Sequence, residues 1–139
     1  LDSSILFNES NLAEIFFRQG KYDSVARADR GLGGSATALV RLAALRKQGN
    51  TAHARTLSDS LAAEMNAPHG DDDGTGRALL FAINAQPDSA FRYLNHMIDV
   101  KAGFIFTGGI PCYFAFQGLY SDPRWDLLIK RINSVRCRG

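Results

Sequence analysis

Apolar side chains recur along most of this chain at intervals of three and four residues, the spacing that places them on one face of an α-helix. The clearest run extends from Ala36 to Gln48, where arginine and lysine occupy much of the opposite face. A second complete run follows from Thr51 to Asn66. Alternation with a period of two, the pattern of a half-buried strand, is essentially absent, so we predict an all-α fold.

Further helices are expected on both sides of these two, seven or eight in all, arranged as antiparallel pairs. The first is capped by Asn8 or Ser10 and ends at Gly20. Two segments interrupt the helical pattern, the Pro/Gly/Asp-rich loop Ala67–Gly76 and the segment Lys101–Pro111. Five further helices are predicted. Two of them begin at Tyr22 and at Pro123, and the other three cover Arg77–Ala85, Pro87–Val100 and Tyr113–Phe116.

Three predicted turns share a short sequence motif, here called the turn phrase, which varies from one turn to the next. The phrase occupies Gln19–Tyr22, Lys47–Asn50 and Asn84–Pro87. After each turn, a second apolar run of helical period begins with a small residue near its start. Repeated helix–turn–helix units of this kind stack into solenoids, which usually bind partners.

These phrases resemble the tetratricopeptide repeat, in which a glycine ends the first helix, an aromatic residue opens the second and an alanine follows three residues later. The marks lie 29 residues apart from Gly20 to Gly49, and then 36 apart to Ala85, against a family period of 34. The repeats are degenerate, because Val25 replaces the alanine, Thr51 the aromatic residue and Ala85 the glycine. The resemblance implies a right-handed α-solenoid of about three helix pairs with a C-terminal capping helix, formed by residues 1–139 as a single domain.

A second resemblance concerns the end of the chain, where Leu119 is followed by Ser121-Asp122-Pro123-Arg124-Trp125. Serine or aspartate before a proline is a strong helix start signal. The phrase resembles the close of tetratricopeptide-like C-terminal regions in bacterial winged-helix transcriptional regulators and in adenylate or guanylate cyclases, although Tyr120 stands where arginine is usual. This resemblance implies a regulatory module from a longer protein that carries a separate effector domain.

Composition and charge narrow the class of partner. The chain has 139 residues, 45% of them hydrophobic, and a net charge of only +2, typical of a globular domain. The single basic cluster comprises Lys130, Arg131, Arg136 and Arg138, too small a footprint to predict nucleic-acid binding. No apolar run is long enough for a membrane helix, so we expect neither nucleic acid nor membrane as a partner.

The residues that invite a catalytic or metal hypothesis lack the spacing that the chemistry requires. Asp71-Asp72-Asp73 do not alternate as calcium ligands do, and we expect a solvated acidic loop with helix-capping capacity that tolerates replacement of all three by asparagine. His53, His69 and His96 are far apart, and we expect surface positions for His53 and His96. No nucleophile elbow or phosphate loop is present. We therefore expect no catalytic residue, no metal, no cofactor and no enzymatic activity.

Two groups of residues are candidates for partner binding. The lysine and asparagine clamp that some tetratricopeptide domains use is absent, because the aligned positions hold Ser10, Glu14, Leu39 and Ala43. The predicted groove on the first helices of the pairs comprises Glu14, Phe17, Arg18, Ala43, Arg46 and Lys47, and ordinary packing or solvated surface is the alternative for each. The predicted aromatic patch comprises Phe104, Phe106, Tyr113 and Phe116, which either caps the solenoid or contacts a partner.

The leading functional hypothesis is a protein or peptide interaction module that acts in regulation or scaffolding. A small-molecule-sensing domain and a homo-oligomerisation module, such as a homodimer, are the alternatives. Cys112 and Cys137 have no metal-ligand spacing. We expect them in a reduced, cytoplasmic setting, and a bridge between them stays open at this point.

Overall fold

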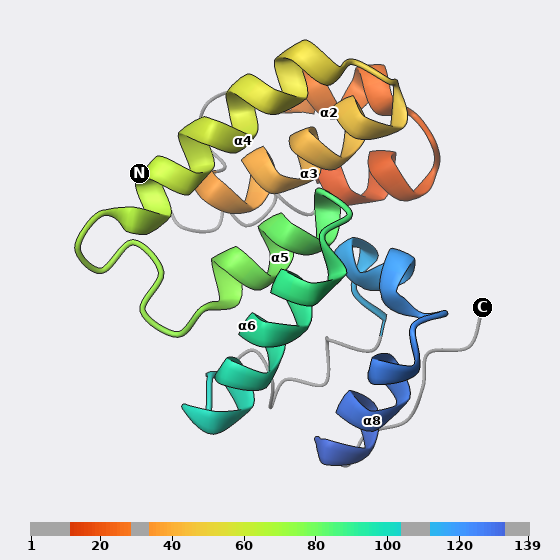
Figure 1. Ribbon diagram of the computed structural model, residues 1–139. Helices are drawn as coiled ribbons and strands as arrows, with labels where there is room; N and C mark the ends of the chain where they lie inside the picture. The colour runs from red at the N-terminus through yellow and green to blue at the C-terminus, as the bar shows by residue number, and fades with distance from the viewer. Residues whose placement is uncertain (1–11, 29–33, 104–111, 133–139) are drawn as a thin grey trace. The chain divides into compact units, whose positions relative to one another are not determined.

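The computed structural model describes residues 12–28, 34–103 and 112–132 (Figure 1). Every regular element in these ranges is helical, which confirms the predicted all-α class. Residues 12–18 are helical. The other elements are α2 (Tyr22–Ala28), α3 (Gly34–Lys47), α4 (Thr51–Asn66), α5 (Thr75–Ile83), α6 (Pro87–Asp99), the 3-10 helix η2 (Phe114–Leu119) and α8 (Pro123–Arg131).

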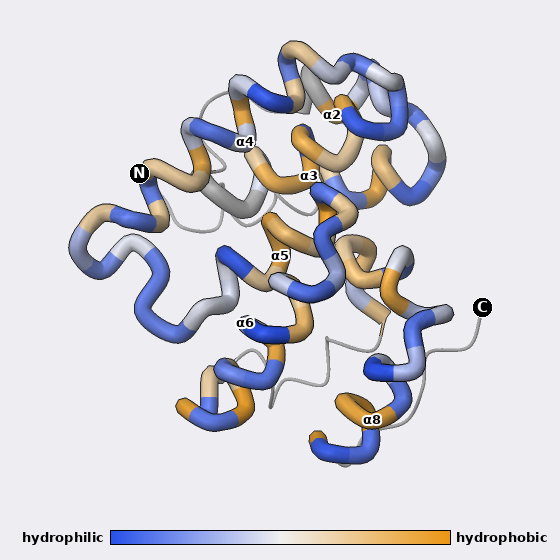
Figure 2. The backbone as a smooth tube through the Cα atoms, viewed as in Figure 1, coloured by the Kyte–Doolittle hydropathy of each residue, from blue (hydrophilic) through white to orange (hydrophobic). Residues whose placement is uncertain are grey.

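The observed boundaries follow the predicted ones closely. The α4 helix has the predicted limits, and α6 begins at the predicted Pro87. The α5 helix begins at Thr75, two residues before the expected Arg77, because aspartate side chains of the preceding loop accept hydrogen bonds from its first N–H groups. That loop is largely hydrophilic (Figure 2). The predicted caps Asn8 and Ser10 lie outside the described residues.

Two compact units make up the chain: an N-terminal unit, residues 1–61, and a C-terminal unit, residues 62–139. The boundary falls inside α4. Helices α2 and α3 pack together in the N-terminal unit, and α5 packs against α6 and η2 in the C-terminal unit. The single domain expected from the sequence stays a prediction.

The three turn phrases adopt one backbone conformation. Its central residue, Gly20, Gly49 or Ala85, has a positive φ of 74°, 71° or 57°. In each turn this residue donates its N–H to the carbonyl three residues back, at 3.0, 3.2 and 3.2 Å. The next N–H bonds to the carbonyl five residues back, at 2.9, 3.0 and 2.9 Å. This is the Schellman C-cap, which satisfies carbonyls at the end of a helix and lets the next helix begin two residues later.

The small residues after these turns are fully buried, as the pattern predicts. Val25, Ala54 and Ala90 each stand five positions after the residue of positive φ, and all are 0% exposed. Seven positions before that residue, the first helices also have fully buried side chains: Ala13, Leu42 and Ala78. The sequence repeat therefore corresponds to a repeat in backbone conformation and in burial.

In the C-terminal unit, two arginines join α8 to α6. At the start of α8, Arg124 donates to Asp88 Oδ1 at 2.8 Å, and its guanidinium lies 4.6 Å from the centroid of the Phe91 ring. At the end of α8, Arg131 donates to Asn95, at 2.8 Å, and to Asp99. Since the starts of the two helices meet and their ends meet, α6 and α8 run in the same direction.

Trp125 is the centre of this C-terminal packing. It is 0% exposed, and its ring lies 5.9 Å from that of Phe116 and 5.2 Å from that of Tyr120. The α8 helix places it there because Asp122 caps the helix and Pro123 fixes its first turn. The indole Nε1 has no hydrogen-bond partner among the described residues.

Candidate functional site

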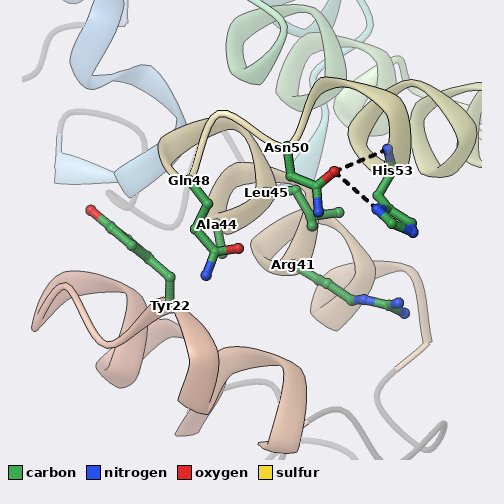
Figure 3. A pocket seen from close by; sticks show the side chains of 7 residues that line it. All are labelled: Tyr22, Arg41, Ala44, Leu45, Gln48, Asn50 and His53. Atoms are coloured by element: carbon green, nitrogen blue, oxygen red, sulfur yellow. Dashed lines mark hydrogen bonds between the residues drawn. The ribbon is translucent and has the colours of Figure 1, made fainter.

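A pocket of about 220 Å³ opens in the N-terminal unit, at the junction of α2, α3 and the start of α4 (Figure 3). Its apolar lining comes from Ala44 and Leu45 of α3, which are buried and half-buried. None of the lining residues is acidic. They are Tyr22, Arg41, Ala44, Leu45, Gln48, Asn50 and His53.

Asn50 fixes one wall of the pocket by capping α4. Its Oδ1 accepts a hydrogen bond from the backbone N–H of His53 at 3.4 Å and lies 2.9 Å from the ring Nδ1. Because an amide oxygen only accepts, His53 Nδ1 carries the hydrogen in this arrangement. Among the described residues the Asn50 Nδ2 group has no hydrogen-bond partner, and His53 Nε2 is an acceptor in this tautomer.

Tyr22 and Gln48 form the opposite side (Figure 3). The Tyr22 ring packs on the buried Phe17 ring, with centroids 5.6 Å apart and a tilt of 54°, a favourable aromatic geometry. Gln48 Nε2 donates to Asp23 Oδ1 at 2.9 Å, which ties the end of α3 to α2. Packing and a polar link thus hold this wall in position.

The pocket favours a negatively charged or acceptor-rich group. Figure 3 shows the Arg41 guanidinium and the His53 imidazole on the same side of the pocket. The first turn of α4 contains no acidic residue, so no carboxylate on that turn offsets the positive end of the helix dipole. The Arg41 guanidinium and the Asn50 amide NH2 group are donors in this lining, and the Tyr22 hydroxyl can donate or accept.

The predicted groove residues do not come together at this pocket. Phe17 and Ala43 are 9% and 7% exposed and belong to the core. Glu14 and Arg18 form an ion pair with each other at 2.7 Å along the helix of residues 12–18. Arg46 and Lys47 are exposed in the last turn of α3.

The predicted aromatic patch is described only in part, because Phe104 and Phe106 lie outside the described residues. Phe116 is 0% exposed and packs against Tyr113, with ring centroids 6.0 Å apart. Tyr113 is half-buried. The two described members therefore pack within the C-terminal unit, as the capping alternative requires.

The acidic loop corrects one expectation from the sequence. The Asp71 side chain is only 4% exposed, not solvated. It accepts from the backbone N–H groups of Gly76, at 2.8 Å, and Arg77, at 3.1 Å, and pairs with the Arg77 guanidinium at 3.0 Å. Arg77 also donates to the carbonyl of Met65 at 2.9 Å. Asp71 thereby anchors the loop to both adjoining helices. The prediction that asparagine could replace all three aspartates did not take these contacts into account.

The other two aspartates of the loop have separate roles. Asp73 accepts hydrogen bonds from the Thr75 hydroxyl, at 2.6 Å, and the Thr75 N–H, at 3.0 Å. These bonds stabilise the carboxylate and lower the pKa of Asp73. Asp72 is exposed and lies 3.1 Å from the exposed His69. His53 and His96 are also exposed, as predicted for these two histidines.

The closing phrase has a structural role throughout. Asp122 accepts from the side chain and the backbone N–H of Arg124, and these bonds lower the pKa of Asp122. Asp122 and Asp88 both accept hydrogen bonds from the Arg124 side chain and raise the pKa of Arg124 above its usual range. Arg124 of this phrase joins α8 to Asp88 of α6, and Asp122 and Arg124 are hydrogen-bonded to each other.

Cys112 is disulfide-bonded, and the sequence contains one other cysteine, Cys137, outside the described residues. Disulfides persist in oxidising compartments, so this bond speaks against the reduced setting expected from the sequence. A cytoplasmic location remains an untested prediction.

Within residues 12–28, 34–103 and 112–132, no group of three His, Cys, Asp or Glu side chains is placed to hold a metal ion. The helices of that described part are all too short or too polar to cross a membrane. No protein-family model matches the chain, and neither the curated proteins nor the solved structures contain a match.

The sequence did not lead us to predict the pocket, although three of its lining residues belong to the turn phrases. Tyr22 belongs to the first turn phrase, and Gln48 and Asn50 belong to the second. In stacked helix pairs, the turns of neighbouring repeats lie close together. Searching for polar residues that flank successive turns would have found these three, and His53, which lies about one helical turn after Asn50, whereas Arg41 lies about two turns before Gln48.

Proposed function

We propose that this chain is a non-catalytic protein–protein interaction module built from tetratricopeptide-like helix pairs. It is the regulatory or scaffolding region of a bacterial multidomain protein. The observation that carries the proposal is the recurrence of one turn, at Gly20, Gly49 and Ala85, with a fully buried small residue five positions later. Modules of this architecture expose long surfaces that bind partner chains.

The packing in the C-terminal unit supports a stacked arrangement. In an array of antiparallel pairs, corresponding helices of neighbouring pairs run in the same direction. Such an array accounts for the parallel course of α6 and α8 and for the packing of η2 on α5. In this proposal α5 with α6 is one pair, and η2 with α8 is a shortened final pair that caps the solenoid.

A selection from a random peptide library displayed on phage, with the full chain as immobilised target, tests the proposal. We expect the enriched peptides to share a sequence pattern and to compete with one another for one surface. Backbone amide shifts of the labelled chain then locate that surface. Enrichment of unrelated peptides, or binding that persists after the chain is unfolded, would count against an interaction module.

A further inference from the structure

The pocket between α2, α3 and α4 has properties that an interaction surface of a helical repeat does not require. It combines a side that carries the Arg41 guanidinium with an apolar floor of Ala44 and Leu45 and an aromatic wall at Tyr22. We infer that this pocket binds a small organic anion with a compact apolar body. The anionic head lies on the Arg41 side, and the body lies between Tyr22 and the floor.

The size of the pocket limits the ligand. Its volume is about 220 Å³, whereas pockets for drug-sized ligands typically measure at least about 300 Å³. The site therefore suits a small ligand, such as a single aromatic ring with a short acidic chain.

Charge determines the sign of the ligand. The guanidinium of Arg41 carries a permanent positive charge, and the start of α4 adds the positive end of a helix dipole without an acidic residue in its first turn. The lining residues include no carboxylate, and Asp23 Oδ1 accepts a hydrogen bond from the lining side chain Gln48 through its Nε2 group. Because the lining carries a guanidinium and no carboxylate, it favours an anion over a cation.

Specific polar groups distinguish the site from a general basic surface. The Asn50 amide nitrogen is directed to the pocket side because Oδ1 is held by His53. The Tyr22 hydroxyl is carried by a ring that packing on Phe17 keeps in place. Donors held before binding lose little freedom when a ligand arrives, which favours binding.

Four probes with the same phenylethyl body test the inference on the full chain: 3-phenylpropionate, 2-phenylethylphosphonate, 3-phenylpropanamide and 2-phenylethylamine. Amide chemical shifts of the labelled protein report both the affinity and the location. We expect the two anions to bind with a Kd on the order of 1 mM and to shift residues around Tyr22, Arg41 and His53. The amide should bind at least about fivefold more weakly, because it lacks a charge–charge interaction, and the amine more weakly still. Comparison of the two anions tells whether the head is a carboxylate or a phosphoryl group.

Variants with a matched control separate the site from general electrostatics. Arg41→Gln should weaken anion binding about fivefold, whereas Lys47→Gln, the same charge change at an exposed position of α3 outside the pocket, should change it less than about twofold. Asn50→Asp retains a good N-cap but places a negative charge in the wall, and should weaken binding at least as much as Arg41→Gln. Asp23→Asn should strengthen it.

Three results would overturn the inference: equal affinity for the amide or the amine, equal effects of Arg41→Gln and Lys47→Gln, or no shift at these residues up to about 20 mM probe, well above the expected Kd. The peptide selection is independent of these outcomes. An anion site can therefore fail while the interaction module stands, and the reverse also holds.

Discussion

Ala85 occupies a backbone conformation that the two corresponding turns assign to glycine. Its φ of 57° compares with 71° at Gly49 and 74° at Gly20. A residue with a Cβ atom loses about 1–2 kcal/mol in this region, whereas glycine loses about 0.4–1 kcal/mol through the greater freedom of its unfolded chain. Ala85 is exposed, so removal of its methyl group forfeits little packing. Ala85→Gly should therefore stabilise the fold by about 0.5–1 kcal/mol.

The reverse change at Gly49 should cost a similar amount. A Cβ atom added there meets no atom within 4 Å, so Gly49→Ala isolates the backbone term from any steric clash. Since the two sites are 36 residues apart and belong to separate compact units, the two changes should act independently in the double variant. As a control, Ala63→Gly makes the same chemical change at an exposed position inside α4. It should destabilise by about 1 kcal/mol, because the backbone there is helical.

Urea unfolding followed by tryptophan fluorescence measures these effects, because Trp125 is the only tryptophan and reports on the C-terminal unit that contains Ala85 and Ala63. With an m-value of about 2 kcal/mol per M, Ala85→Gly should raise the midpoint by about 0.3–0.5 M. Circular dichroism reports on the helices of both units and therefore also registers Gly49→Ala. A lower midpoint for Ala85→Gly, or equal effects of the Ala85 and Ala63 changes, would show that Ala85 does not hold the left-handed conformation in solution.

Three further changes test the packing described above. Trp125→Ala should destabilise by about 3–5 kcal/mol because it empties a fully buried site, whereas Trp125→Phe should cost less than half as much, since the indole N–H has no partner to lose; equal losses in urea unfolding would contradict this packing. Asp71→Asn should destabilise by about 1–3 kcal/mol by weakening a buried ion pair, and the exposed Asp72→Asn should change stability by less than about 0.5 kcal/mol; the opposite ranking would restore the solvated loop. Reducing agent should lower the thermal midpoint of the parent, because a disulfide typically contributes about 2–4 kcal/mol, but it should leave a Cys112→Ser variant unchanged.

Local sequence signals predicted the helices and their ends because those features depend on neighbouring residues. Asp122 and Pro123 marked the start of α8, and the αL turn at Gly49 marked the end of α3, since capping depends on residues within one turn of the helix end. The fully buried Ala90 and Val25 were predicted from their distance to the turn. These features can be recognised in the sequence because each requires a particular residue type at a particular spacing.

Interactions between distant residues were not predictable in the same way. The pair of Arg124 and Asp88 joins positions 36 residues apart, and neither residue type is unusual on a helix surface. Three consecutive aspartates were indistinguishable in sequence, although Asp71 is buried and Asp72 is exposed. The pocket was missed for the same reason, because it is assembled from Tyr22 on one helix and Arg41 on the next.

The turn alone does not establish a helical repeat. Lys101, after α6, also has a positive φ, 56°, and its turn has the same two hydrogen bonds, from Lys101 to Ile98 and from Ala102 to Met97. A Schellman cap ends a third to a half of all helices, so its recurrence is weak support for any architecture. What Gly20, Gly49 and Ala85 share beyond the cap is a side chain, five residues on, with no exposed surface. A buried small residue at a fixed distance from a fixed turn constrains how closely the second helix packs, and that combination supports the proposed stacking of pairs.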